Sequence, residues 1–326
     1  MARRMLTPKP PRPFPPQPRR LPERKRMTIA LGILATDGVV IAADTQEGSG
    51  YPGGTKTSGH KIMSRNMIGQ FAPSGVVRER SIASTGAGWS GHLDAFHQNV
   101  IDGFEVCRNP SLGDRAIKDT VYDFYQRHIL PLHVLGETRQ PSADLIIGVS
   151  WKGDGPRLMA TENSTARRCK GYVAVGAGRE HASMLLSRIL PEPTDVTVQL
   201  ASYLAVYTIF HVKEFIEGCG KNTHVVILKD GHAHYMRDET VSVLELRFND
   251  YLRFDAVAVN YILGRPLKEE GQALNPLIGY LKSIRKNALD LQHVNIESRD
   301  FDLDWGEPTP SIPQPMNSLA TKPTPQ

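Results

Sequence analysis

The sequence predicts an α+β fold in which antiparallel sheets and paired helices form separate layers. Strand-like segments come first, two helical patterns follow, strands return, and two further helical patterns precede one last strand. Such blocks are typical of layered antiparallel architectures, whereas parallel sheets alternate strand and helix along the chain. With 326 residues and 40% hydrophobic content, the chain is long enough to bury a large core.

The first expected element is a β-hairpin. Residues 28–34 and 38–43 are short apolar runs rich in β-branched side chains, with Asp37-Gly38 between them. Asp-Gly is a strong hairpin signal because glycine adopts positive φ without steric cost. A glycine-rich loop follows, and a further strand is expected to begin at Lys61. The segment "ERSIASTGAG" then predicts a strand that ends in a turn opening a helix.

Two helices are predicted after this strand. Apolar side chains at positions 93, 96, 100, 101 and 104 share one face of the first helix. The second helix covers "SLGDRAIKDTVYDFYQRHI", with Ser111 as its N-cap and Pro131 as its end.

The second half of the chain repeats this order. "ADLIIGVSWKGDGPRLMATEN" predicts a hairpin, and "KGYVAVGAG" predicts a strand that ends in small residues. Helical patterns follow in "REHASMLLSRIL" and "TVQLASYLAVYTIFHVKEFI", and "THVVILKDG" predicts the last strong strand. Residues 232–300 are expected to form a C-terminal extension that is partly helical.

The two ends of the chain differ from this core. Residues 1–26 carry nine Lys or Arg, one Glu and eight Pro, so the rest of the chain has a net charge of −3 although the whole has +5. We expect residues 1–26 to be a disordered arm, or an over-called leader before a true start at Met27. Nucleic-acid binding by the arm is the weaker interpretation, because aromatic residues do not alternate with its basic ones. Residues 301–326 are expected to form a disordered tail.

Composition argues against several functional classes. No apolar run reaches the roughly 20 residues of a membrane helix, and the apolar middle of a secretory signal is missing. Cys107, Cys169 and Cys219 are too widely spaced to indicate a disulfide framework or a metal site. A cytoplasmic location and no metal are therefore expected. The chain also lacks the P-loop pattern of a nucleotide-driven unfoldase.

The segment "TIALGILATDGVVIAADT" resembles the opening of proteasome β-type subunits and of the related bacterial peptidase HslV. In that family a mature N-terminal threonine leads a strand, an Asp-Gly or Asn-Gly turn follows, and the next strand ends in an aspartate. Thr28 and Asp44 have this spacing, and Gln46 is similar to the residue of HslV-like chains. The resemblance continues in "STGAG", "VAVGAG" and "HVVILKDG", in the family's order, over about residues 28–231.

This resemblance implies the four-layer αββα sandwich of N-terminal nucleophile hydrolases, assembled with copies of itself into a ring or stack. It also implies a threonine-type peptidase that cleaves peptides or unfolded proteins without any cofactor. A separate ATPase would unfold folded substrates. Neither a membrane nor a nucleic acid is expected as a partner.

The resemblance further implies roles for four residues. A free N-terminal Thr28 would be both nucleophile and base, because an α-amino group has a pKa of about 7.7–8.0. Asp44 would hold a buried lysine beside the threonine, with Lys61 as the candidate and Lys56 as the less favoured alternative. The backbone N–H of Gly86 would form the oxyanion hole. Without the resemblance, Asp44 is interpreted as a turn residue, Lys61 as a solvated charge and Gly86 as part of a helix-start turn.

Three features depart from the family pattern. Met27 stands where most precursors have the glycine at which they cut themselves, so removal of an initiator methionine is the expected route to a free Thr28. Ala177 stands where active members have a serine between two glycines. Glu217 is the candidate for an aspartate before the last strand, shifted by one residue, and Cys219 nearby is expected to be a small buried residue. A catalytically inactive assembly subunit of the same fold is therefore the alternative.

Overall fold

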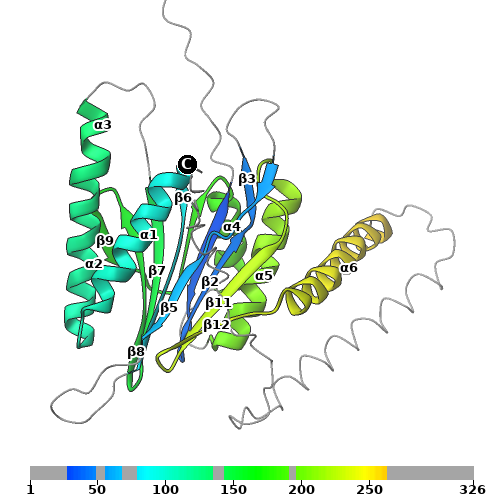
Figure 1. Ribbon diagram of the computed structural model, residues 1–326. Helices are drawn as coiled ribbons and strands as arrows, with labels where there is room; N and C mark the ends of the chain where they lie inside the picture. Colours follow the sequence, from blue (N-terminus) through cyan, green and yellow to red (C-terminus); the bar gives the residue numbers. More distant parts are fainter. Residues whose placement is uncertain (1–27, 49–55, 68–78, 135–142, 191–195, 263–326) are drawn as a thin grey trace, which may run out of the picture.

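The protein forms four layers, with helices on both outer faces of two stacked sheets (Figure 1). The structure is a computed structural model, and the residues that it describes are 28–48, 56–67, 79–134, 143–190 and 196–262. Both five-stranded sheets are antiparallel throughout. The α+β prediction and the αββα sandwich are confirmed. The predicted arm at 1–26 and tail at 301–326 lie outside the described residues.

The first sheet contains the predicted N-terminal hairpin. Its strand order is β10-β1-β2-β11-β12. In chain order the strands are β1 (Ile29–Leu34), β2 (Val39–Asp44), β10 (Tyr172–Gly176), β11 (Thr223–Lys229) and β12 (His232–Tyr235). Gly38 fits the β1–β2 turn because a Cβ there would lie 2.4 Å from the Leu228 carbonyl oxygen. A glycine is therefore required here because the β11 backbone passes close to Gly38, and not because Gly38 adopts the expected positive φ.

The second sheet lies over the first. Its strand order is β5-β6-β7-β8-β9. Its strands are β5 (Met63–Met67), β6 (Arg80–Gly88), β7 (Ala143–Trp151), β8 (Asp154–Glu162) and β9 (Thr165–Arg168). A separate two-stranded ribbon pairs β3 (Gln46–Gly48) with β4 (Lys56–Ser58).

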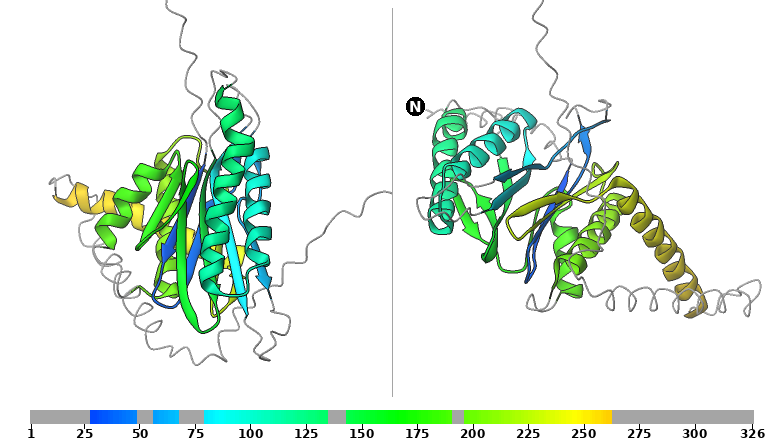
Figure 2. Two further views of the ribbon diagram at one scale, coloured as in Figure 1. Left: turned by 90° about the vertical axis from the view of Figure 1, so that its left-hand side faces the viewer. Right: turned by 60° about the horizontal axis from the view of Figure 1, so that its bottom comes forward.

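Three apolar clusters fill the spaces between the four layers. Strand β2 shows how they arise, because neighbouring side chains of a strand point to opposite faces. Val40 and Ala42 lie in the cluster beneath α4 (Arg179–Ile189) and α5 (Val198–Phe215). Ile41 lies in the cluster between the sheets, with Ile146 and Leu158 of the other sheet. The third cluster lies between the second sheet and the two helices that cover it in Figure 2, α1 (Ser90–Glu105) and α2 (Pro110–Phe124).

The second predicted helix begins and ends at other residues than expected. After α1 (Ser90–Glu105), α2 begins at Pro110 and is capped by Asn109, whose side chain accepts from the Leu112 N–H at 2.9 Å. Asn109 therefore takes the role predicted for Ser111. Helical backbone also continues past Pro131: α2 (Pro110–Phe124) passes into a π turn (Tyr125–Ile129) and then α3 (Leu130–Val134). The π turn widens the backbone before the proline, where an α-helix would clash with its ring.

The last described helix leaves the sandwich. Strand β12 extends the first sheet beyond position 231, and α6 (Asp238–Ile262) follows it. The first half of α6 packs against α5 through Val241 and Phe248, and its second half extends away from the domain (Figure 2). Among the described helices, none is both long and apolar enough to cross a membrane.

Candidate active site

Thr28 is the first described residue and lies directly before β1. Its side chain is buried, because β1 is flanked by β10 and β2 and covered by α5. Its hydroxyl Oγ1 donates a hydrogen bond of 2.8 Å to Oδ1 of Asp44. The hairpin turn brings these two residues together, since Thr28 precedes β1 and Asp44 ends β2.

Asp44 is fully buried and accepts hydrogen bonds from three separate segments. Oδ1 accepts from Thr28 Oγ1, from the Ile29 N–H at 3.1 Å and from Lys61 Nζ at 2.7 Å. Oδ2 accepts from the Gly220 N–H at 2.9 Å. Four donors, one of which is the Lys61 cation, offset the cost of removing this carboxylate from water. Asp44 is therefore not a turn residue but the centre of a buried polar cluster.

Lys61 supplies the cation of this cluster. Its Nζ lies 2.6 Å from Thr28 Oγ1 and 2.7 Å from Asp44 Oδ1, and it also donates to the backbone carbonyl of Gln46. The side chain is 12% exposed, so it is not a solvated charge. Its own carbonyl accepts from Thr85 Oγ1 at 2.9 Å, which fixes Lys61 to β6. Lys56 lies instead in β4, opposite Gly48.

A positively charged ammonium group at this distance changes the chemistry of the threonine hydroxyl. Positive charge stabilises the deprotonated form of a neighbouring group. The cluster of Thr28, Asp44 and Lys61 can therefore ease the loss of the hydroxyl proton. Asp44 holds the ammonium group in place through its own charge.

The turn after β10 encloses the backbone of Thr28. Gly176 has φ of +97°, and a Cβ there would lie 2.3 Å from the Thr28 carbonyl oxygen. The Gly178 N–H donates to that same oxygen at 3.5 Å. Ala177, between the two glycines, is partly buried against the α5 side of the first sheet. Its methyl group offers no hydrogen bond to the site.

Gly86 lies inside β6, where it is paired with Leu145, rather than in the turn that opens α1. A Cβ at this position would lie 2.5 Å from the Asp144 carbonyl oxygen and 3.1 Å from the Leu93 side chain. Only glycine fits without displacing the neighbouring strand. The neighbouring residue Thr85 bonds to Lys61, so this part of β6 lies next to the buried cluster.

The turn at residues 216–222, called the 216–222 turn below, closes the opposite side of the cluster. Besides the bond from Gly220 to Asp44, the Asn222 N–H donates to Thr45 Oγ1 at 3.0 Å. Gly220 was not among the predicted site residues, although two glycines around a cysteine just before a strand were a usable signal. Glu217 is exposed in this turn, and its supporting role stays a prediction.

Cys219 lies in the same turn and is buried. Burial raises the pKa of its thiol to about 12, and the negative charge of Asp44 adds to this effect. The thiol is therefore protonated near neutral pH and is a poor nucleophile.

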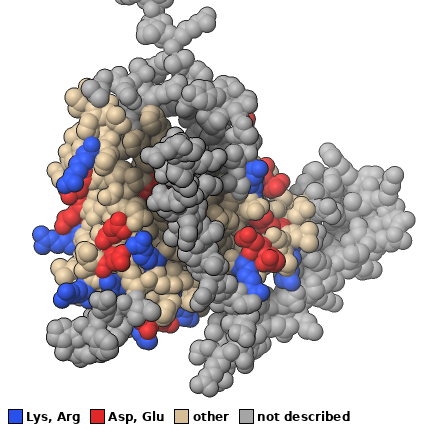
Figure 3. Space-filling view, viewed as in Figure 1, with Lys and Arg blue, Asp and Glu red and all other residues tan. Residues whose placement is uncertain are grey.

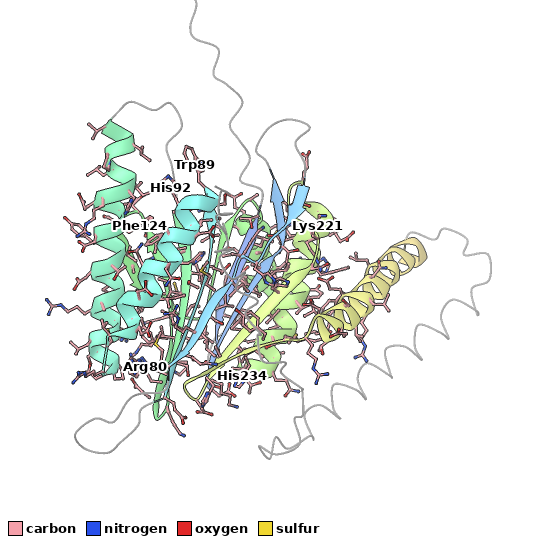
Figure 4. The ribbon with its side chains drawn as sticks, in the orientation of Figure 1. Arg80, Trp89, His92, Phe124, Lys221 and His234 are labelled. Carbon is pink, nitrogen blue, oxygen red and sulfur yellow. The ribbon has the colours of Figure 1, made fainter. Side chains whose placement is uncertain are left out.

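Aromatic, basic and acidic side chains all occur on the surface of the domain. Figure 4 shows Trp89 and His92 at the start of α1 and Lys221 in the 216–222 turn, at the same end of the molecule. Acidic and basic side chains of the described residues lie side by side on the face in Figure 3. At the other end of α1, Arg65 forms ion pairs with Asp102 and Glu105. Within the described ranges, no group of three or more His, Cys, Asp or Glu side chains is placed to bind a metal ion.

Comparison with solved structures identifies proteins of the same fold. Anbu from Hyphomicrobium sp. strain MC1 superposes with a TM-score of 0.53 and 17% identity, covering 71% of this chain and 97% of that one. Anbu from Yersinia bercovieri, described as an ancestral beta-subunit, gives 0.54 and 12%, with coverages of 71% and 97%. The helical assembly of the Anbu complex from Pseudomonas aeruginosa gives 0.51 and 16%, with coverages of 74% and 97%. No protein-family model and no curated protein matches the sequence.

These comparisons correct one expectation. The sequence suggested the proteasome β-type and HslV-like family of N-terminal threonine hydrolases, but the similar structures are Anbu proteins, which are proteasome-like and distinct. The assignment rested on the Thr28-to-Asp44 spacing, on Gln46 and on the order of several short motifs, all of which proteasome-like proteins can share without belonging to one branch. At 12–17% identity, the likeness establishes the fold. The chain thus has the proteasome-like N-terminal nucleophile hydrolase fold that Anbu proteins share.

Proposed function

We propose that this protein is a threonine-type peptidase in which Thr28, once it is the N-terminal residue, cleaves peptide bonds. The observation that carries the proposal is the position of Lys61, whose Nζ lies 2.6 Å from Thr28 Oγ1 and 2.7 Å from Asp44 Oδ1. Packing alone gives no reason to bury a lysine against a threonine hydroxyl at the end of a strand. A nucleophile that must lose its proton gives such a reason.

The reaction follows from the groups around Thr28. Oγ1 attacks the carbonyl carbon of the scissile peptide bond while its proton passes to the free α-amino group. The tetrahedral oxyanion is stabilised by the backbone N–H of Gly86. Collapse expels the amine, which takes the proton, and leaves an acyl ester on Oγ1. A water molecule then hydrolyses that ester. Lys61 favours the deprotonated hydroxyl throughout, and Asp44 holds Lys61.

We also infer that the chain works in an assembly with copies of itself. The fold it shares with the helical assembly of the Anbu complex from Pseudomonas aeruginosa supports this inference. A self-assembled chamber would restrict access to peptides and unfolded chains. Folded substrates would then require a separate ATPase.

A catalytically inactive assembly subunit is the second candidate. Ala177 favours it, because a methyl group cannot order the α-amino group as a serine hydroxyl can. A chain that retains Met27 and the residues before it would favour it too, since a blocked Thr28 has no base. The buried Lys61 argues against it, because its desolvation serves no purpose without a nucleophile.

The proposal requires Thr28 to have a free α-amino group, so the test compares chains with different N-terminal residues. The protein would be produced from a cleavable fusion so that one form starts at Thr28 and another keeps Met27. Hydrolysis of fluorogenic peptides is expected only from the first form. Thr28→Ala should abolish hydrolysis while assembly, measured by light scattering, is unchanged. Thr165→Ala, at the exposed first residue of β9, is the matched control and should keep full activity. Equal hydrolysis by wild type and Thr28→Ala would refute the proposal.

A further inference from the structure

Helix α6 contacts the rest of the domain through a carboxylate as well as through its apolar face. Oε1 of Glu245 accepts from Lys213 Nζ at 2.5 Å and from Thr223 Oγ1 at 2.7 Å. Glu245 and Lys213 are 22% and 10% exposed, so this ion pair is largely shielded from water. Such shielded, charge-assisted contacts are stronger than surface pairs.

Both partners of Glu245 belong to the structure that encloses Asp44. Lys213, near the end of α5, also donates from Nζ to the carbonyl of Lys221 at 2.9 Å, so it ties α6 to the 216–222 turn. Thr223, at the start of β11, is buried and lies opposite Asp44 in the sheet register. A chain of contacts therefore runs from α6 through the 216–222 turn to the Gly220 N–H, and from there to Asp44.

We propose that Glu245 is a positioning residue for the candidate active site. The proposal rests on the peptidase function proposed above. Without the carboxylate, Lys213 is a buried cation with no counter-charge, so it leaves Lys221 and turns toward water. The 216–222 turn then loosens, Gly220 withdraws its N–H from Asp44, and Lys61 is held less firmly against Thr28.

This role predicts a particular kinetic effect. The contacts position the reacting hydroxyl, so their loss lowers kcat and leaves KM nearly unchanged. Apolar contacts of Val241 and Phe248 hold α6 on α5 independently of Glu245. Glu245→Gln should therefore keep the fold and reduce kcat about tenfold, which corresponds to about 1.4 kcal/mol of transition-state stabilisation.

The experiment compares Glu245→Gln with Glu239→Gln, which removes one exposed negative charge from the first turn of the same helix. The expected result is a lower kcat and faster amide hydrogen exchange in residues 216–222 for Glu245→Gln only, with exchange in β7 unchanged. Lys213→Met combined with Glu245→Gln should be no worse than the worse single variant. Glu245→Asp, which keeps the charge, is the second variant should Glu245→Gln not fold, and should show a smaller fall in kcat.

Three outcomes would overturn the proposal: an unchanged kcat with unchanged exchange, an equal effect in Glu239→Gln, or multiplicative effects of the Lys213 and Glu245 variants. An inactive wild type with a free Thr28 would instead refute the peptidase function. Hydrogen exchange of the 216–222 turn would then decide the positioning role by itself, because it requires no activity.

Discussion

Replacing Asp44 with Asn tests whether this carboxylate organises the candidate site. The side chain keeps its shape but loses its charge. An NH₂ group, which cannot accept a hydrogen bond, replaces one of the two oxygens that accept the four hydrogen bonds. The Lys61 cation is then left without a counter-charge at 12% exposure. Removing one partner of a buried ion pair costs about 3–5 kcal/mol, whereas a change at an ordinary surface position costs under about 0.5 kcal/mol. For a domain of this size, a loss of about 3–5 kcal/mol in the free energy of unfolding lowers Tm by about 6–20 °C.

Equilibrium unfolding in guanidinium chloride at pH 7, followed by tryptophan fluorescence, measures this difference. The buried Trp151 is a suitable reporter of the second sheet. Asp102→Asn makes the same acid-to-amide change at a half-exposed residue that pairs with Arg65 at 3.4 Å, and should cost less than about 1 kcal/mol. Adding Lys61→Met to Asp44→Asn should recover part of the loss, because the unpaired cation is gone. If Asp44→Asn and Asp102→Asn lower the free energy of unfolding equally, the buried cluster does not stabilise the fold more than a surface ion pair, and the reasoning fails.

Three further predictions concern single side chains. In the chain that starts at Thr28, Lys61→Met should reduce the kcat of peptide hydrolysis at least 10²-fold while KM changes little. A loss of less than twofold would exclude a role for the cation. Burial lowers the pKa of His97 to about 4, below the value of about 6.5 in an unfolded chain, so the unfolded state binds more protons between these pH values. Stability should therefore fall by about 3 kcal/mol as pH drops from 6.5 to 4, and His97→Gln should lack this component in urea unfolding curves. With its pKa raised to about 12, Cys219 should resist iodoacetamide at pH 8 until the chain is unfolded, and rapid labelling of native protein, read by mass spectrometry, would contradict its burial.

Much of the fold could be predicted because its signals are local. Two short apolar runs around Asp37-Gly38 indicate the β1–β2 hairpin, and block order distinguishes two antiparallel sheets from a parallel one. The proximity of Thr28 and Asp44 follows from that hairpin. Their catalytic roles, with those of Lys61 and Gly86, stay predictions.

The features that could not be predicted depend on contacts between distant segments. Gly220 donates to Asp44 across 176 positions, and no local pattern indicates which backbone N–H will meet a buried carboxylate. Gly176 is required by the position of the Thr28 carbonyl, which belongs to another strand. The continuation of helix past Pro131 depends on a π turn, which propensities do not predict. Glu245 lies in the predicted C-terminal extension, and its role became visible only once its partners Lys213 and Thr223 were placed.

The wide separation of the donors to Asp44 has a consequence for biosynthesis. Thr28 and Lys61 emerge early during translation, but the Gly220 N–H that completes the acceptor set of Asp44 is made after most of the domain. Contacts between such distant segments form late in folding. A nascent or truncated chain lacking this last part has the reactive hydroxyl without the frame that holds Lys61 against it. Synthesis order itself would thus keep the proposed peptidase inert until the 216–222 turn is made.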